Sequence, residues 1–158
     1  MSSMKRPRLI FRASEHPSSK RLVNSLQQFA KPGGEPTRMT NPTDMVKRPW
    51  GGYLILRKKT NFWVKKLYVN EGARLSLQRH QHRNELWLVL NGKISAQVGN
   101  QTREVNEGEL VFVPKNTKHR ITGLSQATVL EFAFGKVLER DIERFEDDFG
   151  RAGTPCYP

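Results

Sequence analysis

The stretch Gly72-Ala-Arg-Leu-Ser-Leu-Gln-Arg-His-Gln-His-Arg-Asn-Glu-Leu-Trp87 decides how this 158-residue chain is interpreted. Side chains alternate between the two faces of a β-strand, so the polar residues of this stretch fall on one face. These residues are Arg74, Ser76, Gln78, His80 and His82. A polar row with two histidines needs water or a ligand on its face, because burying it without partners costs free energy. If the row faces the inside of a β-barrel, the interior is a polar pocket.

Two residues farther along the chain can join this row. Glu85 opens the next expected strand, directly after a turn at Arg83-Asn84, and His119 follows a second Gly- and Pro-containing segment, 108–118. Imidazole nitrogens, a carboxylate and an amide oxygen form a mixed nitrogen–oxygen ligand set, which suits Zn²⁺, Mn²⁺, Fe²⁺, Co²⁺ or Ni²⁺. One histidine alone would be an ordinary polar residue, whereas the convergence of several favours a divalent metal site.

Short runs rich in β-branched and aromatic residues surround this segment. Strands are expected at 53–57, 62–69, 74–78, 85–90, 93–98, 101–105, 110–113, 119–122 and 127–134. Asn91-Gly92 is the strongest hairpin signal between them, because both residues accept a positive φ. So many closely spaced strands indicate an all-β fold, an antiparallel sandwich or barrel. After Gly135, the residues Val137, Leu138, Asp141, Ile142 and Phe145 fall at helical spacing and predict a short C-terminal helix over a barrel edge.

Composition excludes several other classes of protein. No apolar run approaches the ~20 residues of a membrane-spanning helix. A single cysteine, Cys156, excludes a disulfide framework and any multi-cysteine metal site. The formal net charge of +12 favours anionic partners, such as phosphorylated small molecules or nucleic acid.

Residues 1–45 are basic and rich in Ser, Pro and Gly, and we interpret them as a mostly disordered N-terminal arm. Three interpretations of this arm remain open: an organelle transit peptide, a basic arm in weak contact with nucleic acid, or an untidy tail upstream of Met45. The tail is favoured, since the arm has neither interleaved aromatic residues nor a folded reading element. A folded domain is expected over 46–151, followed by a tail at 152–158.

Two segments of the chain resemble the two sequence motifs of the cupin superfamily. The first motif is Gly, five residues, His-x-His, three or four residues, Glu, six residues, Gly; Gly72 to Gly92 follows it with Gln78 in place of the first His. The second is Gly, five residues, Pro-x-Gly, two residues, His; Gly108 to His119 follows it with Asn116 in place of Gly, and Asn also tolerates a left-handed turn. The resemblance implies a double-stranded β-helix, the cupin jelly roll. It also implies a metal-binding set made of Gln78, His80, Glu85 and His119.

A closer resemblance covers about residues 47–151. Four segments are similar to type II mannose-6-phosphate isomerase: Arg48-Pro49-Trp50-Gly51, Leu75-Ser76-Leu77-Gln78, 80–87 and 141–151. That family is usually the C-terminal cupin domain of a bifunctional mannose-1-phosphate guanylyltransferase/mannose-6-phosphate isomerase. The resemblance implies metal-dependent interconversion of mannose 6-phosphate and fructose 6-phosphate, which would feed GDP-mannose and polysaccharide synthesis. Guanylyltransferase activity is not expected, because no Gly-rich nucleotide-binding loop is present; Leu138 and Arg140 depart from the family pattern.

The resemblance also implies a role for each candidate residue. One divalent ion, Zn²⁺ or alternatively Mn²⁺, Co²⁺ or Mg²⁺, would polarise the sugar oxygens. His82 is the first candidate for the proton carrier, because imidazole titrates near neutral pH. Glu131 and Glu85 are its rivals, although a metal-bound Glu85 would be a poor base, and Arg83 is a further catalytic candidate. The candidates for binding the sugar phosphate are Arg74, Ser76, Arg120, Arg144 and Arg151.

Two other functions remain as alternatives. A non-catalytic cupin module could bind a sugar phosphate or a nucleotide sugar without converting it. The third hypothesis is another cupin enzyme, such as an oxygenase or a different sugar-phosphate isomerase or epimerase. Gln78 and the Arg-rich surroundings argue against the oxygenase, because a common oxygenase set has two histidines and one carboxylate. We further expect a cytoplasmic protein with no membrane association, and homodimerisation through sheet edges stays an open prediction.

Overall fold

A computed structural model describes residues 45–138 and 140–153, which form eleven β-strands and no helix. The strands are β1 (Val46–Arg48), β2 (Gly51–Lys58), β3 (Phe62–Val69), β4 (Leu77–Arg79), β5 (Arg83–Asn91), β6 (Lys93–Val98), β7 (Gln101–Asn106), β8 (Leu110–Val113), β9 (His119–Gly123), β10 (Ala127–Gly135) and β11 (Glu143–Glu146). The predicted arm at 1–45 lies almost wholly outside these residues, and so does most of the predicted tail.

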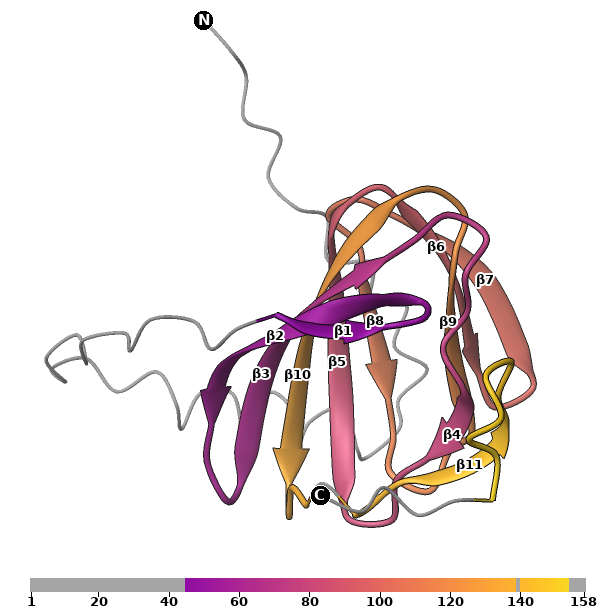
Figure 1. Ribbon diagram of the computed structural model, residues 1–158. Helices are drawn as coiled ribbons and strands as arrows, with labels where there is room; N and C mark the ends of the chain where they lie inside the picture. Colours follow the sequence, from indigo (N-terminus) through magenta and orange to yellow (C-terminus); the bar gives the residue numbers. More distant parts are fainter. Residues whose placement is uncertain (1–44, 139, 154–158) are drawn as a thin grey trace, which may run out of the picture. The chain divides into compact units, whose positions relative to one another are not determined.

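The strands form two antiparallel sheets that face each other across the interior (Figure 1). One sheet has six strands in the order β1-β2-β3-β10-β5-β8, and the other has five in the order β11-β4-β9-β6-β7. Every one of the nine predicted strand segments overlaps a strand of the structure. The all-β, double-sheet prediction is therefore confirmed. Within residues 45–138 and 140–153, no helix has the length and apolar character of a membrane-spanning segment.

The hairpin predicted at Asn91-Gly92 is wrong. β5 pairs with β10 and β8, whereas β6 pairs with β7 and β9, so the chain crosses here from one sheet to the other. A type I′ hairpin needs positive φ at both central residues, but Gly92 alone has it, at 78°. A tight two-residue hairpin instead joins β6 to β7 at Gly99-Asn100, where Val98 pairs with Gln101.

The predicted C-terminal helix is wrong as well. Residues 143–146 form β11, which adds to the edge of β4 with Arg144 opposite Gln78. An open strand edge offers unpaired N–H and C=O groups, and pairing with them outweighs a weak helical pattern. Phe145 also lies under two cations, with Lys118 Nζ 3.9 Å from its ring centroid. Val137 packs instead with Trp63 and Ala133 in a small buried cluster.

The interior changes from apolar to polar along the strands of the six-stranded sheet. On β10, the inward residue Val129 lies opposite Leu67 and Val89, and all three belong to the main hydrophobic core. Two residues further, the inward position is occupied by the buried Glu131. Because side chains of one face recur every second residue, the inward row of β3 changes at the same level, from Leu67 to Lys65. On β5 the change comes one inward position later, from the buried Trp87 to Glu85. The core therefore fills one end of the barrel and leaves a polar pocket at the other.

Candidate metal centre and anion pocket

Three buried residues bring possible metal ligands together at the polar end of the barrel. They are His80, directly after β4, Glu85 in β5, and His119 at the start of β9. Their ligand atoms all lie within 4.8 Å of one another. His80 Nε2 is 3.1 Å from Glu85 Oε1, and His119 Nε2 is 3.6 Å from Glu85 Oε2. Each side chain is at most 2% exposed, so the cluster is shielded from bulk water.

Backbone carbonyl groups fix which nitrogen of each imidazole carries its proton. His80 Nδ1 donates to the carbonyl oxygen of Asp141, and His119 Nδ1 donates to that of Thr117 at 2.8 Å. A carbonyl oxygen only accepts hydrogen bonds, so each Nδ1 is protonated and each Nε2 keeps a lone pair. Both lone pairs belong to the nitrogens that face Glu85, which is the tautomer that metal binding requires.

The turn before His119 is hydrogen-bonded to the backbone of His80. Asn116 has a φ of 61°, the one positive value of a non-glycine residue in the described ranges. Its backbone N–H donates to the carbonyl oxygen of His80 at 2.7 Å. Asparagine therefore replaces the expected glycine in this left-handed position without breaking the turn.

Gln78 completes the donor set. It lies opposite His119 across β4 and β9, and its Nε2 is 3.3 Å from His80 Nε2 and 3.5 Å from His119 Nε2. Its Oε1 accepts a hydrogen bond from the Ser76 hydroxyl at 2.8 Å. Two imidazole nitrogens, a carboxylate and an adjacent amide fit Zn²⁺, Mn²⁺ or Co²⁺, and turning the amide over would present its oxygen as the fourth ligand.

The electrostatics of the cluster favour a cation. Burial opposes ionisation of Glu85, but the neighbouring His80, His119 and Arg83 hold the pKa of its carboxyl well below the usual value. Burial lowers the pKa of His119 to about 4, so its imidazole is neutral at physiological pH. Burial, and next the charge of Glu85, raise the pKa of Glu131. An ionised Glu85 beside the neutral imidazole of His119 is a state in which a divalent ion would bind.

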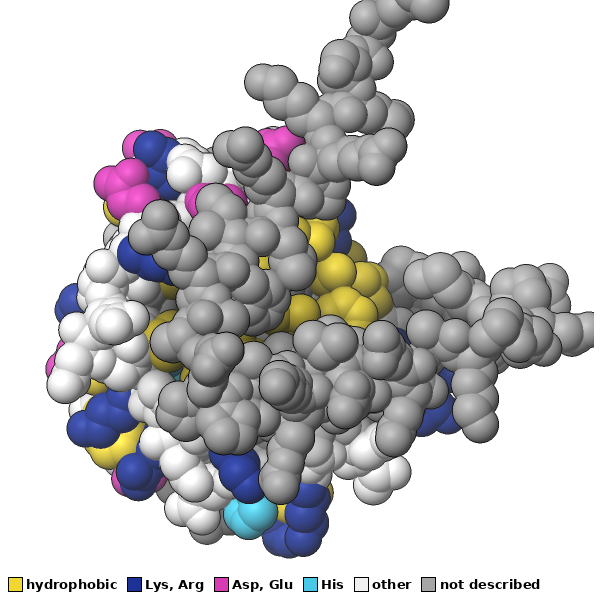
Figure 2. Space-filling view, turned by 180° about the vertical axis from the view of Figure 1, so that it is seen from behind, with side chains coloured by type: hydrophobic (Ala, Val, Ile, Leu, Met, Phe, Trp, Pro, Cys, Tyr) yellow, Lys and Arg dark blue, Asp and Glu magenta, His cyan; other side chains and the backbone are white. Residues whose placement is uncertain are grey.

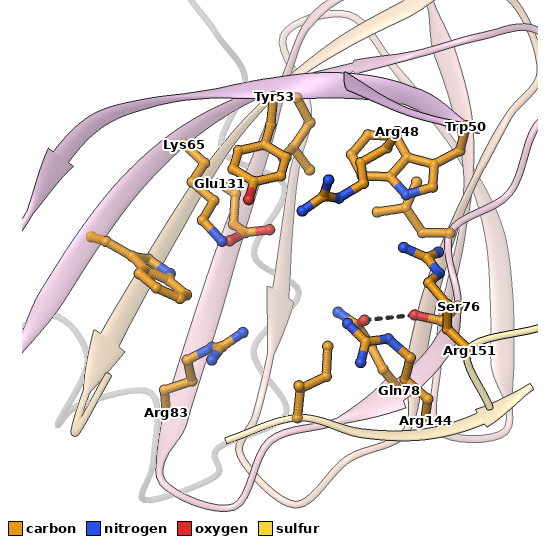
Figure 3. Close-up of a pocket in the computed structure, with 14 residues that line it drawn as sticks. Arg48, Trp50, Tyr53, Lys65, Ser76, Gln78, Arg83, Glu131, Arg144 and Arg151 are labelled. Carbon is orange, nitrogen blue, oxygen red and sulfur yellow. Dashed lines mark hydrogen bonds between the residues drawn. The ribbon is translucent and has the colours of Figure 1, made fainter. Parts of the chain in front are cut away.

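A pocket rich in cationic side chains opens beside the cluster and shares Gln78 and Arg83 with it (Figure 3). It is lined by Arg48, Trp50, Tyr53, Trp63, Lys65, Leu67, Leu75, Ser76, Gln78, Arg83, Glu131, Ile142, Arg144 and Arg151. Figure 3 shows Arg144 and Arg151 on the side of Ser76 and Gln78, with Lys65 and Glu131 facing them. Five cationic side chains around a single carboxylate make this pocket suitable for an anionic ligand.

Three of the predicted site residues lie away from this pocket. Arg74 forms a two-point ion pair with Asp148 at 2.6 and 2.7 Å on the surface, and Arg120 Nη1 donates to Glu146 Oε2 at 3.0 Å. His82 is 51% exposed, with its Nδ1 3.2 Å from Asp141 Oδ1. Figure 2 shows that one face of the molecule carries a histidine side chain at the surface, close to Lys and Arg side chains.

The alternation that predicted an inward His82 ends with β4. Asp141 accepts hydrogen bonds from the backbone N–H groups of Gln81 and His82, at 2.9 and 3.0 Å. These contacts bend the chain directly after the buried His80, so His82 lies in a different surface pocket beside Arg79 and Lys136. Of the predicted proton carriers, Glu131 is the one that lines the main pocket.

Sequence reasoning missed Arg48, Tyr53 and Lys65 as pocket residues. The sequence did carry a signal for Lys65 as a pocket residue. It places a charge in the inward row of β3, between Trp63 and Leu67. A buried charge in such a row needs a partner or a ligand. Arg48 had no comparable signal, since it lies at the end of the short edge strand β1.

Solved structures with the same architecture identify the fold. An RmlC-like cupin from Shewanella frigidimarina superposes with a TM-score of 0.54 at 14% identity, covering 70% of this chain and 95% of that chain. Oxalate decarboxylase from Bacillus subtilis superposes with a TM-score of 0.59 at 17% identity, covering 71% of this chain and 33% of that chain. The fold is therefore that of a cupin, and its polar end holds a candidate metal centre.

The family model described as mannose-6-phosphate isomerase C-terminal matches residues 36–147, and the chain belongs to this family. The alginate biosynthesis protein AlgA of Pseudomonas aeruginosa is 38% identical over 114 residues, 70% of this chain and 24% of that protein. The mannose-1-phosphate guanylyltransferase RfbM of Salmonella typhimurium is 37% identical over 108 residues, 66% of this chain and 22% of that protein. The chain thus spans about a quarter of the length of these relatives.

Proposed function

We propose that this chain is a metal-dependent aldose–ketose isomerase that interconverts mannose 6-phosphate and fructose 6-phosphate. The observation that carries the proposal is the juxtaposition of the buried His80–Glu85–His119 cluster with the cation-lined pocket. A phosphorylated sugar needs both features, because its carbonyl end must be polarised and its phosphate must be held. Membership of the mannose-6-phosphate isomerase C-terminal family supports this choice of substrate.

His80, Glu85 and His119, with Gln78 beside them, would hold one divalent ion, for which Zn²⁺ is our first choice and Mn²⁺, Co²⁺ or Mg²⁺ are the alternatives. The bound ion would supply Lewis-acid polarisation of the sugar oxygens at C1 and C2. The carbonyl contacts at each Nδ1 keep both imidazoles in the orientation that this requires.

The phosphate group would be held by Arg144 and Arg151, with Arg48 across the pocket. Guanidinium groups donate two parallel hydrogen bonds to phosphate oxygens, so they fix its orientation as well as its charge. Arg151 is itself positioned by Asp147, which accepts from its Nη2 at 2.7 Å. Trp50 would close the pocket as an apolar wall and exclude water from the sugar.

Glu131 would carry the proton between C1 and C2. It is buried, it lines the pocket, and its pKa is raised by burial and then by the charge of Glu85. A carboxylate with a raised pKa takes up a proton from carbon more readily than one in water. The positive charge of Lys65, which lines the same pocket, partly opposes this rise in the pKa of Glu131.

The proposal is tested by mixing the full chain, supplied with Zn²⁺, with mannose 6-phosphate and measuring fructose 6-phosphate. Unphosphorylated mannose is the matched control for the phosphate contacts. We expect turnover with mannose 6-phosphate and a kcat/KM at least ~100-fold lower with mannose, because two or more charge-assisted hydrogen bonds are lost. Saturable binding without conversion would replace the isomerase with a non-catalytic sugar-phosphate module. Neither binding nor turnover would reject both functions.

A further inference from the structure

Arg83 places a permanent cation at the metal cluster. It is the first residue of β5, it is 5% exposed, and Figure 3 shows it extending into the pocket. Its Nε donates to Glu85 Oε1 at 3.1 Å, and its Nη2 lies 2.9 Å from His80 Nε2. Since a guanidinium group has no acceptor and the Nδ1 of His80 carries the ring proton, Nη2 donates to the Nε2 lone pair.

The same atoms are the ones that a metal ion needs. His80 Nε2 and Glu85 Oε1 are 3.1 Å apart, and both present lone pairs. With the ring proton of His80 on Nδ1, these two lone pairs repel each other, and a positive group beside them relieves that repulsion. Arg83 supplies that group here, and one lone pair of an imidazole nitrogen cannot both accept from Nη2 and ligate an ion.

The rest of the Arg83 side chain is held firmly in this position. Its Nη1 donates to the carbonyl oxygens of Leu138 and Asp141, at 3.1 and 3.4 Å. Its guanidinium carbon lies 4.8 Å from the centroid of the Trp63 ring, within the range of a cation–π contact. Several contacts must therefore be given up when the guanidinium moves away from the cluster.

We propose that Arg83 is a built-in competitor of the metal ion: its guanidinium donates to His80 Nε2 and Glu85 Oε1, and a divalent cation that binds these atoms must displace it. This inference rests on the metal-binding part of the proposed function. It predicts that the chain binds its ion more weakly than the ligand set alone would allow. The displaced guanidinium has room in the adjoining pocket, which it already lines.

The test measures the Zn²⁺ affinity of the full chain by competition with a chromophoric chelator. Arg83→Met keeps an unbranched, largely apolar side chain but removes the guanidinium, including its cation–π contact with Trp63, and we expect it to bind Zn²⁺ at least tenfold more tightly. Arg83→Lys keeps the cation with fewer donors, and its affinity should fall between the two. Arg79→Met is the matched control, because Arg79 pairs with Glu143 outside the cluster, and its affinity should stay within twofold of wild type.

Equal or weaker Zn²⁺ binding by Arg83→Met would overturn the proposal, and so would a complete failure of both proteins to bind. Circular dichroism checks that each variant is folded. If Arg83→Met does not fold, the nuclear magnetic resonance signal of the Arg83 Nε–H group in the wild-type chain decides. Saturating Zn²⁺ should shift that signal and leave the Arg79 Nε–H signal in place; an unchanged Arg83 signal would overturn the proposal. These readouts need no turnover, so failure of the isomerase activity alone is distinguishable.

Discussion

Glu131 of β10 and Lys65 of β3 are direct cross-strand partners, and both line the pocket. Oppositely charged residues in such a pair lie close enough to interact across the strands. The charge of Lys65 lowers the pKa of Glu131, whereas burial and then Glu85 raise it. The six-stranded sheet thus contributes a carboxylate whose basicity is set by opposing neighbours, next to a possible metal site.

Glu131→Gln should abolish most of the isomerase activity without emptying the metal site. The amide has nearly the same shape but cannot accept a proton, so we expect kcat to fall by a factor of about 10²–10⁴. The Zn²⁺ content of the purified protein should stay the same. Glu104→Gln, an exposed carboxylate near Lys93, is the control and should retain full activity. Retention of activity by Glu131→Gln would exclude Glu131 as the proton carrier.

Arg48→Met should weaken binding of the phosphorylated sugar more than it slows the reaction. Arg48 lines the pocket from the edge strand β1, with its guanidinium carbon 5.5 Å from the Tyr53 ring centroid. Loss of one charge-assisted hydrogen bond should raise KM about tenfold and change kcat less than twofold. The neighbouring Lys47, which is exposed and does not line the pocket, provides the control variant Lys47→Met. Equal KM values for the two variants would refute a phosphate-binding role for Arg48.

Stability of the metal-free protein should fall as the pH drops from about 6.5 toward 4. Burial lowers the pKa of His119 to about 4 from its usual 6.5, so within this window the unfolded chain binds more protons than the folded one. The free energy of unfolding therefore decreases by up to ~1.4 kcal/mol for each unit by which the pH is lowered. Urea unfolding with chelator present, compared between wild type and His119→Gln, isolates the contribution. The slope should be smaller in the variant, and equal slopes would contradict the lowered pKa.

Gly92→Ala should destabilise the fold much more than Gly72→Ala. Both glycines have positive φ, 78° and 72°. A Cβ at Gly92 would lie 2.3 Å from the backbone oxygen of Gln126, whereas a Cβ at Gly72 would meet nothing within 4 Å. We therefore expect ~1 kcal/mol from backbone strain at Gly72 and a further ~1–3 kcal/mol at Gly92 from the forced backbone shift. Thermal unfolding measures both, and equal losses would show that the close approach at Gly92 relaxes without cost.

The sequence predicted the strands well because their pattern is local. β5 alternates buried and part-exposed residues over its first seven positions, which a period of two reveals directly. Pairing is not local, and Asn91-Gly92 illustrates the limit. A glycine with positive φ occurs both in a hairpin and in a crossover between sheets, so only the partners of β5 and β6 distinguish the two.

The candidate site was likewise predictable where it depends on local pattern and not where it depends on distant contacts. Strand alternation placed Ser76 and Gln78 on one face, and the motif spacing added Glu85 and His119 to them. Strand alternation gave the wrong position for His82, because nothing in the local sequence marks the point where β4 ends and Asp141 bends the chain. The competing position of Arg83 also depends on carbonyl groups of residues more than fifty positions away, which sequence spacing does not reveal.

The central claim is that the His80–Glu85–His119 cluster holds a divalent ion on which isomerase turnover depends. The most direct measurement is fructose 6-phosphate formation from mannose 6-phosphate by the full chain as purified, after chelation, and after return of Zn²⁺, Mn²⁺, Co²⁺ or Mg²⁺ separately. We predict that turnover disappears on chelation and returns with at least one of these ions. Turnover that survives complete removal of metal, or a folded and metal-loaded protein that never converts the sugar, would contradict the claim.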